Sequence, residues 1–197
     1  EYTIYDVLIE DYDINKIIFK TEIDNLDIIP ANIQLAGAEI ELTNTKYREK
    51  TLKEKINLIE KDYDFIIIDC PPSLGLLSLN ALTASAAVLI PIQCEYYSLE
   101  GVGQLIDTVK LVRKNLNPKL EIEGVLLNMF DGRTNLSVQV VEEVKKYFKD
   151  KVYRTVIPRS VRLAEAPSFG QPIMLYDDKS KGSIAYTKLS EEFIKNN

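Results

Sequence analysis

The chain has 197 residues, of which 46% are hydrophobic, and it carries a formal net charge of −6. This length suffices to bury one sizeable core, so we expect residues 1–197 to form a single domain. Apolar runs stay far below the roughly 18 residues that cross a bilayer, and no signal-peptide pattern opens the sequence, so we expect a cytoplasmic protein without membrane contact. Histidine is absent, and Cys70 and Cys94 lack metal-ligand spacing, which argues against a zinc site or a disulfide framework.

The charge is distributed unevenly along the chain. Residues 1–64 contain 15 acidic and 8 basic side chains, whereas residues 145–181 contain 9 basic and 4 acidic ones. An anionic partner is therefore expected to meet the C-terminal part. The alternative is a chance cluster of solvated lysines, which charge alone favours.

The first third of the chain predicts short helices and two strands. Two short apolar helical patterns occur in an acidic opening, and the stretch Leu26–Pro30, which a proline ends, is typical of a strand. Apolar residues at positions i, i+4 and i+7 predict a helix over residues 50–61 that packs on a sheet. Phe65–Asp69 is a continuous apolar run closed by an aspartate, typical of a parallel strand buried on both faces.

The remainder alternates strands with helices. The predicted strands are Val88–Ile92, Ile122–Asn128 and Val152–Ile157. The longest helical pattern has one apolar stripe over residues 105–116, and Asn117-Pro118 ends it. This alternation predicts an α/β fold with a doubly wound, mostly parallel sheet and helices on both faces.

In such sheets ligands bind beyond the carboxyl ends of the strands, which draws attention to Asp69. An unpaired buried carboxylate costs several kcal/mol, so an aspartate that closes a buried strand needs a charge to serve or hydrogen bonds to accept. In phosphate-binding families a strand-terminal aspartate holds Mg²⁺. The alternative is an aspartate that caps the next turn.

Five stretches of this sequence resemble the ParA/Soj family of chromosome-partitioning ATPases. They are DFIIIDCPPSLG at 64–75, NALTAS at 80–85, PIQCEYYSLEG at 91–101, IPRSVRLAEAPS at 157–168 and IPANIQLAGAE at 29–39. The resemblance covers essentially the whole chain. It implies a fold like that of P-loop NTPases, with ATP and Mg²⁺ as cofactors.

The resemblance also implies roles for individual residues near the nucleotide. Asp69 matches the Walker B aspartate, which acts on Mg²⁺ through water, and Pro71 and Pro72 match switch II, which responds to the γ-phosphate. Asn128 matches a position at the adenine edge, although a turn asparagine at a strand end is the alternative. Pro158 and Arg159 match the loop beside the base.

Arg133 and Arg162 match positions that bind duplex DNA without sequence preference in this family. A guanidinium suits this task because its planar fork binds two phosphate oxygens at once. The alternative is that both are surface arginines with carboxylate partners. The family further implies a ParB/Spo0J-type centromere-binding partner, a homodimer in the ATP-bound state and association with the nucleoid.

The family's phosphate loop is not found in this sequence. That loop needs Gly-x-x-x-x-Gly-Lys-Ser/Thr, because glycine backbones approach the phosphates while the lysine neutralises them. No Gly-Lys dipeptide occurs here, so we expect this chain to be an N-terminally truncated, inactive part of an ATPase. The alternative is a short, non-catalytic DNA- or partner-binding module. A MinD-like membrane ATPase is disfavoured, because the tail after Ile184 lacks a cationic amphipathic face.

The same comparison predicts a gap in the sheet. In the family, the strand that leads into the phosphate loop lies between the strand ending at Asp69 and the strand Val88–Ile92. Without it, we expect the two strands to pair directly, another chain to fill the gap, or the sequence to be part of a longer protein. Unpaired backbone groups at such a gap cost about 1 to 3 kcal/mol each.

Overall fold

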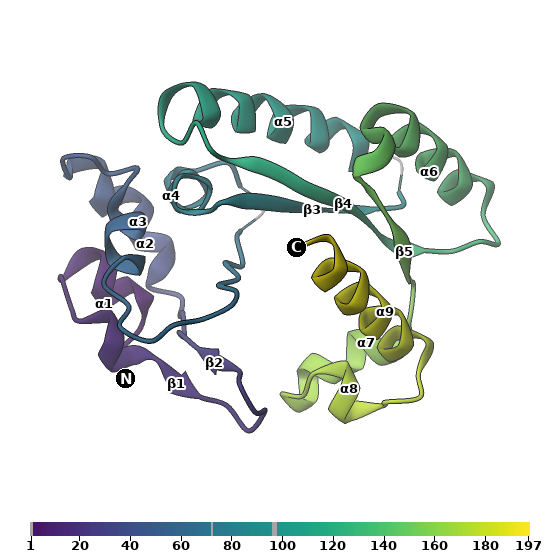
Figure 1. Ribbon diagram of the computed structural model, residues 1–197, viewed down its shortest axis with the longest axis horizontal. Helices are drawn as coiled ribbons and strands as arrows, with labels where there is room; N and C mark the ends of the chain where they lie inside the picture. The colour runs from purple at the N-terminus through teal and green to yellow at the C-terminus, as the bar shows by residue number, and fades with distance from the viewer. Residues whose placement is uncertain (1, 72, 96–97) are drawn as a thin grey trace. The chain divides into compact units, whose positions relative to one another are not determined.

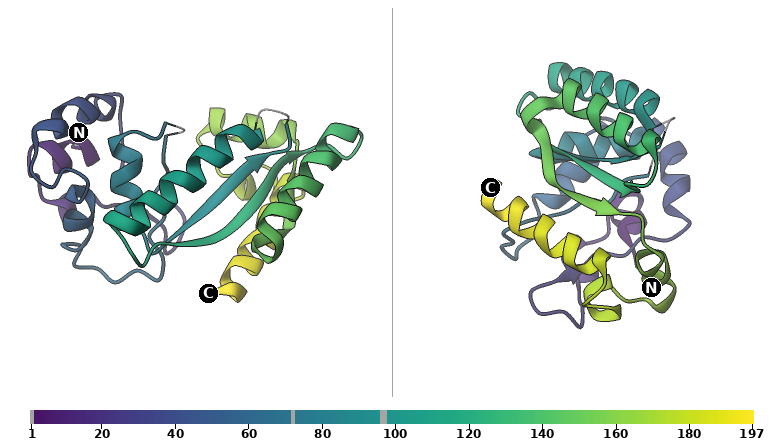
Figure 2. Two further views of the ribbon diagram at one scale, coloured as in Figure 1. Left: turned by 90° about the horizontal axis from the view of Figure 1, so that it is seen from above. Right: turned by 90° about the vertical axis from the view of Figure 1, so that its right-hand side faces the viewer.

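The computed structural model describes residues 2–71, 73–95 and 98–197, with the backbone alone described for residues 98–100 (Figures 1 and 2). These residues form two compact units. The first comprises Glu1–Ala86 and Asp107–Leu120, and the second comprises Ala87–Ile106 and Glu121–Asn197. The long helix α5 (Ser98–Asn115) contributes residues to both.

The first unit is mainly helical. Its elements are α1 (Ile4–Ile9), η1 (Ile14–Ile17), β1 (Phe19–Lys20), β2 (Asp27–Ile28), α2 (Leu35–Glu41), η2 (Leu42–Asn44), α3 (Thr51–Ile56) and α4 (Leu76–Ala84), together with the second half of α5. A capping box begins α1, because the Asp6 carboxylate accepts from the backbone N–H of Thr3 at 2.7 Å while the Thr3 hydroxyl caps the helix. The two predicted helical patterns of the opening are therefore confirmed as α1 and η1.

Two predicted elements of this unit are shorter than expected. The strand predicted over Leu26–Pro30 is reduced to β2, which pairs antiparallel with β1. The helix predicted over residues 50–61 ends at Ile56, because Ile59 leaves the helical path and packs on the small cluster formed by α1 and η1. Ile56 and Leu52 pack instead on Leu8 and Ala81.

The strand predicted over Phe65–Asp69 is wrong. The run is irregular, and the side chains of Ile66 and Ile67 are 51% and 87% exposed. Ile68, which is partly buried, packs against the core cluster of Leu8, Leu52 and Ala81. A strand needs a neighbour to receive its backbone hydrogen bonds, and no strand of the described residues pairs with this run.

The second unit contains a parallel sheet, as predicted. β3 (Ala87–Gln93), β4 (Glu121–Phe130) and β5 (Val152–Pro158) are hydrogen-bonded in the order β3-β4-β5, and within the described part of the chain β3 pairs with β4 alone. The helical elements are α6 (Asn135–Phe148), η3 (Lys149–Lys151), α7 (Val161–Glu165), η4 (Ala166–Phe169), α8 (Ile173–Tyr176) and α9 (Lys181–Asn196).

Helices cover both faces of this sheet. On one face, Val125 and Leu127 of β4 pack with Ile106 of α5 and with Val140 and Val144 of α6. On the other face, Leu126 of β4 packs with residues of β5 and of α7 and α9. Figures 1 and 2 show α6 and α9 on opposite sides of the strands. Alternate residues of β4 point to opposite faces, and both faces are covered, so its central run Val125–Leu127 is apolar.

The start of β5 bulges out of register and is held by α9. The pairs Val125↔Val152 and Leu127↔Val156 show that two residues of β4 face four of β5. The backbone N–H groups of Arg154 and Thr155 within this bulge donate to the two carboxylate oxygens of Glu192, at 2.7 and 2.9 Å. Glu192 therefore satisfies amides that the ladder leaves unpaired.

Candidate functional site

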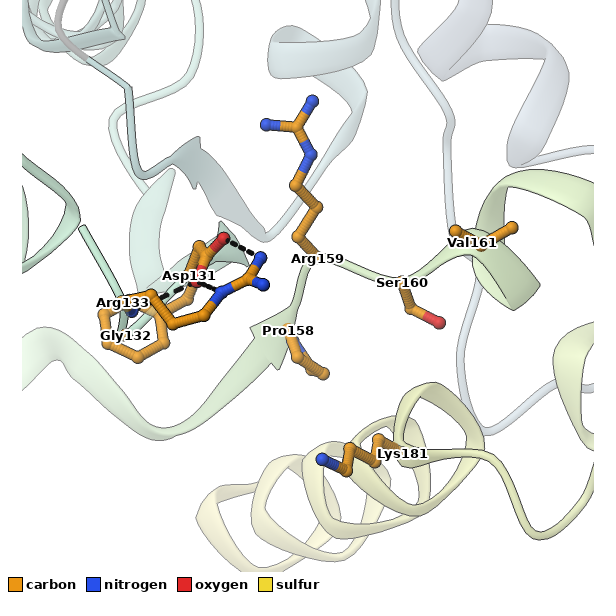
Figure 3. A pocket seen from close by; sticks show the side chains of 9 residues that line it. Asp131, Gly132, Arg133, Pro158, Arg159, Ser160, Val161 and Lys181 are labelled. Atoms are coloured by element: carbon orange, nitrogen blue, oxygen red, sulfur yellow. Dashed lines mark hydrogen bonds and ion pairs between the residues drawn. The ribbon is translucent and has the colours of Figure 1, made fainter.

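The loops after β4 and β5 meet at the carboxyl edge of the parallel sheet. The backbone N–H of Arg159 donates to the carbonyl of Phe130 at 3.0 Å, which ties the two loops together. They form an open pocket of about 490 Å³ (Figure 3). Its lining residues are Phe130, Asp131, Gly132, Arg133, Pro158, Arg159, Ser160, Val161 and Lys181.

The pocket brings together three residues that the sequence assigned to two ligands. Arg133 was expected at DNA, whereas Pro158 and Arg159 were expected beside the nucleotide base. All three line one pocket, while Asn128 and Arg162 are not among its lining residues. The shared edge of β4 and β5 explains the grouping, because parallel strands end on the same side.

Asn128 is engaged in the backbone geometry of its own strand end. Its side-chain oxygen accepts from the backbone N–H of Met129 at 2.8 Å, and its carbonyl accepts from the N–H of Cys94 at 2.9 Å. Met129 has a φ of 53°, a left-handed conformation that non-glycine residues rarely adopt. The asparagine thus stabilises the bend that directs the following loop toward the pocket.

Arg133 forms a bidentate ion pair with Asp131. Its Nε and Nη2 atoms lie 2.8 and 2.6 Å from the two oxygens of Asp131. Hydrogen bonds from the Arg133 side chain and then from its backbone N–H lower the pKa of Asp131 to about 2. The Arg133 side chain is 88% exposed, so it reaches solvent with much of its charge already neutralised.

Arg159 and Arg162 also have carboxylate partners. Arg159 lies 3.9 Å from Glu95, and Arg162 lies 3.1 Å from Glu165 and 3.4 Å from Asp177. These are half-exposed pairs, which contribute little to stability and remain available to other anions.

Lys181 and Asp131 are pocket residues that the sequence analysis did not single out. Lys181 is the first residue of α9, and Ser180 caps this helix by accepting from the N–H of Ser183 at 3.1 Å. A serine followed by an apolar helical pattern is the signal for this helix start, and Lys181 closes the basic stretch of the sequence. Asp131 could not be paired with Arg133 beforehand, because the loop conformation decides that contact.

Asp69 belongs to the first unit and is exposed, which corrects the expectation of a buried strand end. It takes part in no ion pair of the described residues. Pro71 follows in the same irregular segment, and Pro72 lies outside the described residues. Burial and then the charge of Asp69 raise the pKa of the Cys70 thiol.

The residues present fit a magnesium ion that is held mainly by water and phosphate. No group of three or more His, Cys, Asp or Glu side chains that could hold a metal occurs among residues 2–71, 73–95 and 98–197. Mg²⁺ commonly binds through one or two carboxylates and keeps several waters. Asp69, with its exposed carboxylate, is suited to such a contact.

Comparison with known proteins identifies the family. A family model described as an AAA domain matches residues 1–122. The sporulation initiation inhibitor protein Soj of Bacillus subtilis is 61% identical over 196 residues, which cover 100% of this chain and 78% of that protein. The chromosome partitioning protein ParA of Myxococcus xanthus is 53% identical over 193 residues, which cover 98% of this chain and 68% of that protein.

A solved structure with bound nucleotide has a similar fold. The crystal structure of cobyrinic acid a,c-diamide synthase from Mycobacterium smegmatis with bound ADP and magnesium has a TM-score of 0.82 at 35% identity, covering 98% of this chain and 71% of that chain. No helix in the described residues is both long and apolar enough to cross a membrane. With more than half of its residues identical to Soj of Bacillus subtilis and to the chromosome partitioning protein ParA of Myxococcus xanthus over nearly its full length, the chain belongs to the ParA/Soj family of chromosome-partitioning ATPases.

Proposed function

We propose that the protein is an ATP-switched, non-specific DNA-binding ATPase that partitions chromosomes or plasmids with a ParB-type partner. The observation that carries this proposal is the pocket at the carboxyl edge of β4 and β5, where Arg133 and Arg159 meet in a member of a partitioning family. Residues 1–197 belong to one ATPase domain, and the intact protein dimerises with ATP on the nucleoid.

The nucleotide contacts follow the matched positions. Asp69 acts on Mg²⁺ through water, and Pro71 and Pro72 respond to the γ-phosphate. Asn128, Pro158 and Arg159 lie beside the base. ATP and Mg²⁺ supply a conformational switch, since a nucleotide shifts an equilibrium only by its differential affinity for the two states.

The 197 residues alone lack a Gly-Lys phosphate cradle, so they bind Mg-ATP weakly and do not hydrolyse it. The reason is that the phosphate loop supplies most of the electrostatic stabilisation of the transferred group. Calorimetric titration of this chain with Mg-ATP is expected to show an affinity weaker than micromolar. Micromolar binding would contradict this part of the proposal.

DNA binding is tested with the protein at its natural length. Arg133→Ala and Arg162→Ala should each weaken binding to duplex DNA equally on unrelated sequences, and binding should fall steeply with salt. Fluorescence anisotropy over a salt series measures both effects. If either variant keeps full affinity at moderate salt, that arginine is a surface residue that only pairs with its carboxylate neighbours.

A further inference from the structure

The cations around the pocket differ in whether a carboxylate neutralises them. Arg133 pairs with Asp131, Arg159 with Glu95, and Arg162, three residues further on, with Glu165 and Asp177. Lys181 is exposed and forms no ion pair within the described ranges of the chain. Its charge is therefore uncompensated in a pocket whose other cations are paired.

The position of Lys181 is fixed by packing of the helix start. Gly182 is buried so closely against α7 that a Cβ there would lie 2.6 Å from the Leu163 side chain. Ser183 is buried as well, and Ser180 caps its N–H. The backbone of Lys181 is thus held beside the pocket, and only the flexible side chain remains to be ordered when an anion binds.

The start of α9 adds to the positive potential at this place. A helix of 16 residues carries a partial positive charge at its N-terminus, where backbone N–H groups lack carbonyl partners. Figure 3 shows the Lys181 side chain at the α9 end of the pocket, with Arg133 and Arg159 around Pro158. The field of the helix and the charge of Lys181 reinforce each other.

We propose that Lys181 contacts a backbone phosphate of duplex DNA and contributes at least as much to DNA affinity as Arg133. This inference rests on the proposed DNA-binding function. A paired arginine must share or release its carboxylate when a phosphate arrives, and this cost reduces the net gain. Lys181 has no such partner to release, so more of its attraction to phosphate appears as affinity.

The chemistry of the pocket favours a DNA phosphate over the phosphates of a nucleotide. Lysine acts as a point charge without geometric demands, which suits contacts that do not depend on sequence. The pocket is open, and its one lining glycine, Gly132, offers no run of glycine amides to enclose a polyphosphate. An extended strand of phosphates meets such an open surface without being enclosed.

The test compares Lys181→Ala with Lys188→Ala in the protein at its natural length. Lys188 is a second exposed lysine, two turns further along α9, and it does not line the pocket. Removing one phosphate contact changes the slope of log K against log salt by about 0.9, which corresponds to about 8-fold weaker binding at 0.1 M salt. We expect this loss for Lys181→Ala on every duplex, near-unaltered binding for Lys188→Ala, and retained binding for Lys181→Arg.

Anisotropy with Mg-ATP and two unrelated duplexes measures these affinities, and calorimetry with Mg-ATP provides the second readout. Equal losses for Lys181→Ala and Lys188→Ala would show a general charge effect and overturn the inference, as would weaker ATP binding with unchanged DNA affinity. If Arg133→Ala weakens binding and Lys181→Ala does not, the inference fails while the proposed function stands. If the unaltered protein binds no DNA, the proposed function itself fails.

Discussion

Two apolar runs of the chain look alike in sequence and differ in structure. The run Phe65–Asp69 and the segment Val125–Asn128 of β4 are both continuous and both end in a polar residue. β4 lies between β3 and β5 and buries Val125 and Leu127 completely, whereas the first run forms no strand and exposes Ile67. An apolar run is thus one condition for a buried strand, and a neighbouring strand that pairs with it is the other.

The ends of the two runs differ in the same way. After β4, hydrogen bonds hold Asn128 to Met129, Asp131 to Arg133 and Phe130 to Arg159. After the first run, the Asp69 carboxylate is exposed and takes part in no ion pair of the described residues. A strand that is paired within a sheet therefore has its following loop held in place as well.

The largest expected effect compares Ile90→Ala with Ile67→Ala in the 197-residue chain. Ile90 of β3 is 2% exposed and Ile67 is 87% exposed. The first change removes a core side chain and should lower the free energy of unfolding by about 2 to 5 kcal/mol. The second should change it by less than about 0.5 kcal/mol. Urea denaturation measures both.

If Ile90→Ala and Ile67→Ala lower the free energy of unfolding equally, the two runs do not differ as described, because Ile67 would then be buried as well. The same substitution, Ile67→Ala, is then measured in the protein at its natural length. A cost there of about 2 kcal/mol or more would mean that a further segment covers the run.

A smaller effect is expected at the bulge of β5. Glu192→Ala leaves the backbone N–H groups of Arg154 and Thr155 without their carboxylate, and should cost about 1 to 3 kcal/mol of stability. Glu191→Ala, at an exposed neighbouring position, is the control and should be near neutral. Chemical denaturation at neutral pH separates the two. A neutral Glu192→Ala would mean that water satisfies these amides equally well.

The Glu192 contribution should depend on pH in a defined direction. Burial raises the pKa of this carboxyl, but the hydrogen bonds from Arg154 and Thr155 outweigh it, and the folded pKa lies below the ordinary value of 4.5. The stabilisation is therefore complete above pH 4.5 and is lost as the pH falls through the folded pKa. The difference in free energy of unfolding between the unaltered protein and Glu192→Ala should therefore become smaller as the pH is lowered below 4.5. If this difference grows on acidification, the ionised Glu192 carboxylate is not what stabilises the fold.

A third test uses the charge at the end of β4. Asp131→Asn removes the partner of Arg133 and should raise DNA affinity, by up to about 8-fold at 0.1 M salt if one full charge is gained. Asp178→Asn removes the same charge from an exposed aspartate and should change affinity less. Anisotropy measures both variants. Lower affinity for Asp131→Asn would mean that the ion pair positions Arg133 for DNA instead of competing with it.

Much of the second unit could be predicted from sequence, and specific residues show why. Val88–Ile92, Ile122–Asn128 and Val152–Ile157 became β3, β4 and β5 because each run had a strand neighbour within the same unit. The strand prediction for Phe65–Asp69 failed because an apolar pattern carries no information about which strands lie beside it.

Within the candidate site, sequence reasoning found Arg133, Pro158 and Arg159, since their motifs are local. It did not find Lys181, which reaches the pocket only through the packing of α9 against α7. It also could not foresee that Asp131 neutralises Arg133, because that contact depends on the turn after β4.

The most direct test of the central claim is the affinity of the natural-length protein for duplex DNA with a non-hydrolysable ATP analogue and with Mg-ADP. An ATP switch requires different DNA affinities in the two nucleotide states. We predict binding at least about tenfold tighter with the analogue, which corresponds to about 1.4 kcal/mol. Equal affinity in both states, or none in either, would contradict the account.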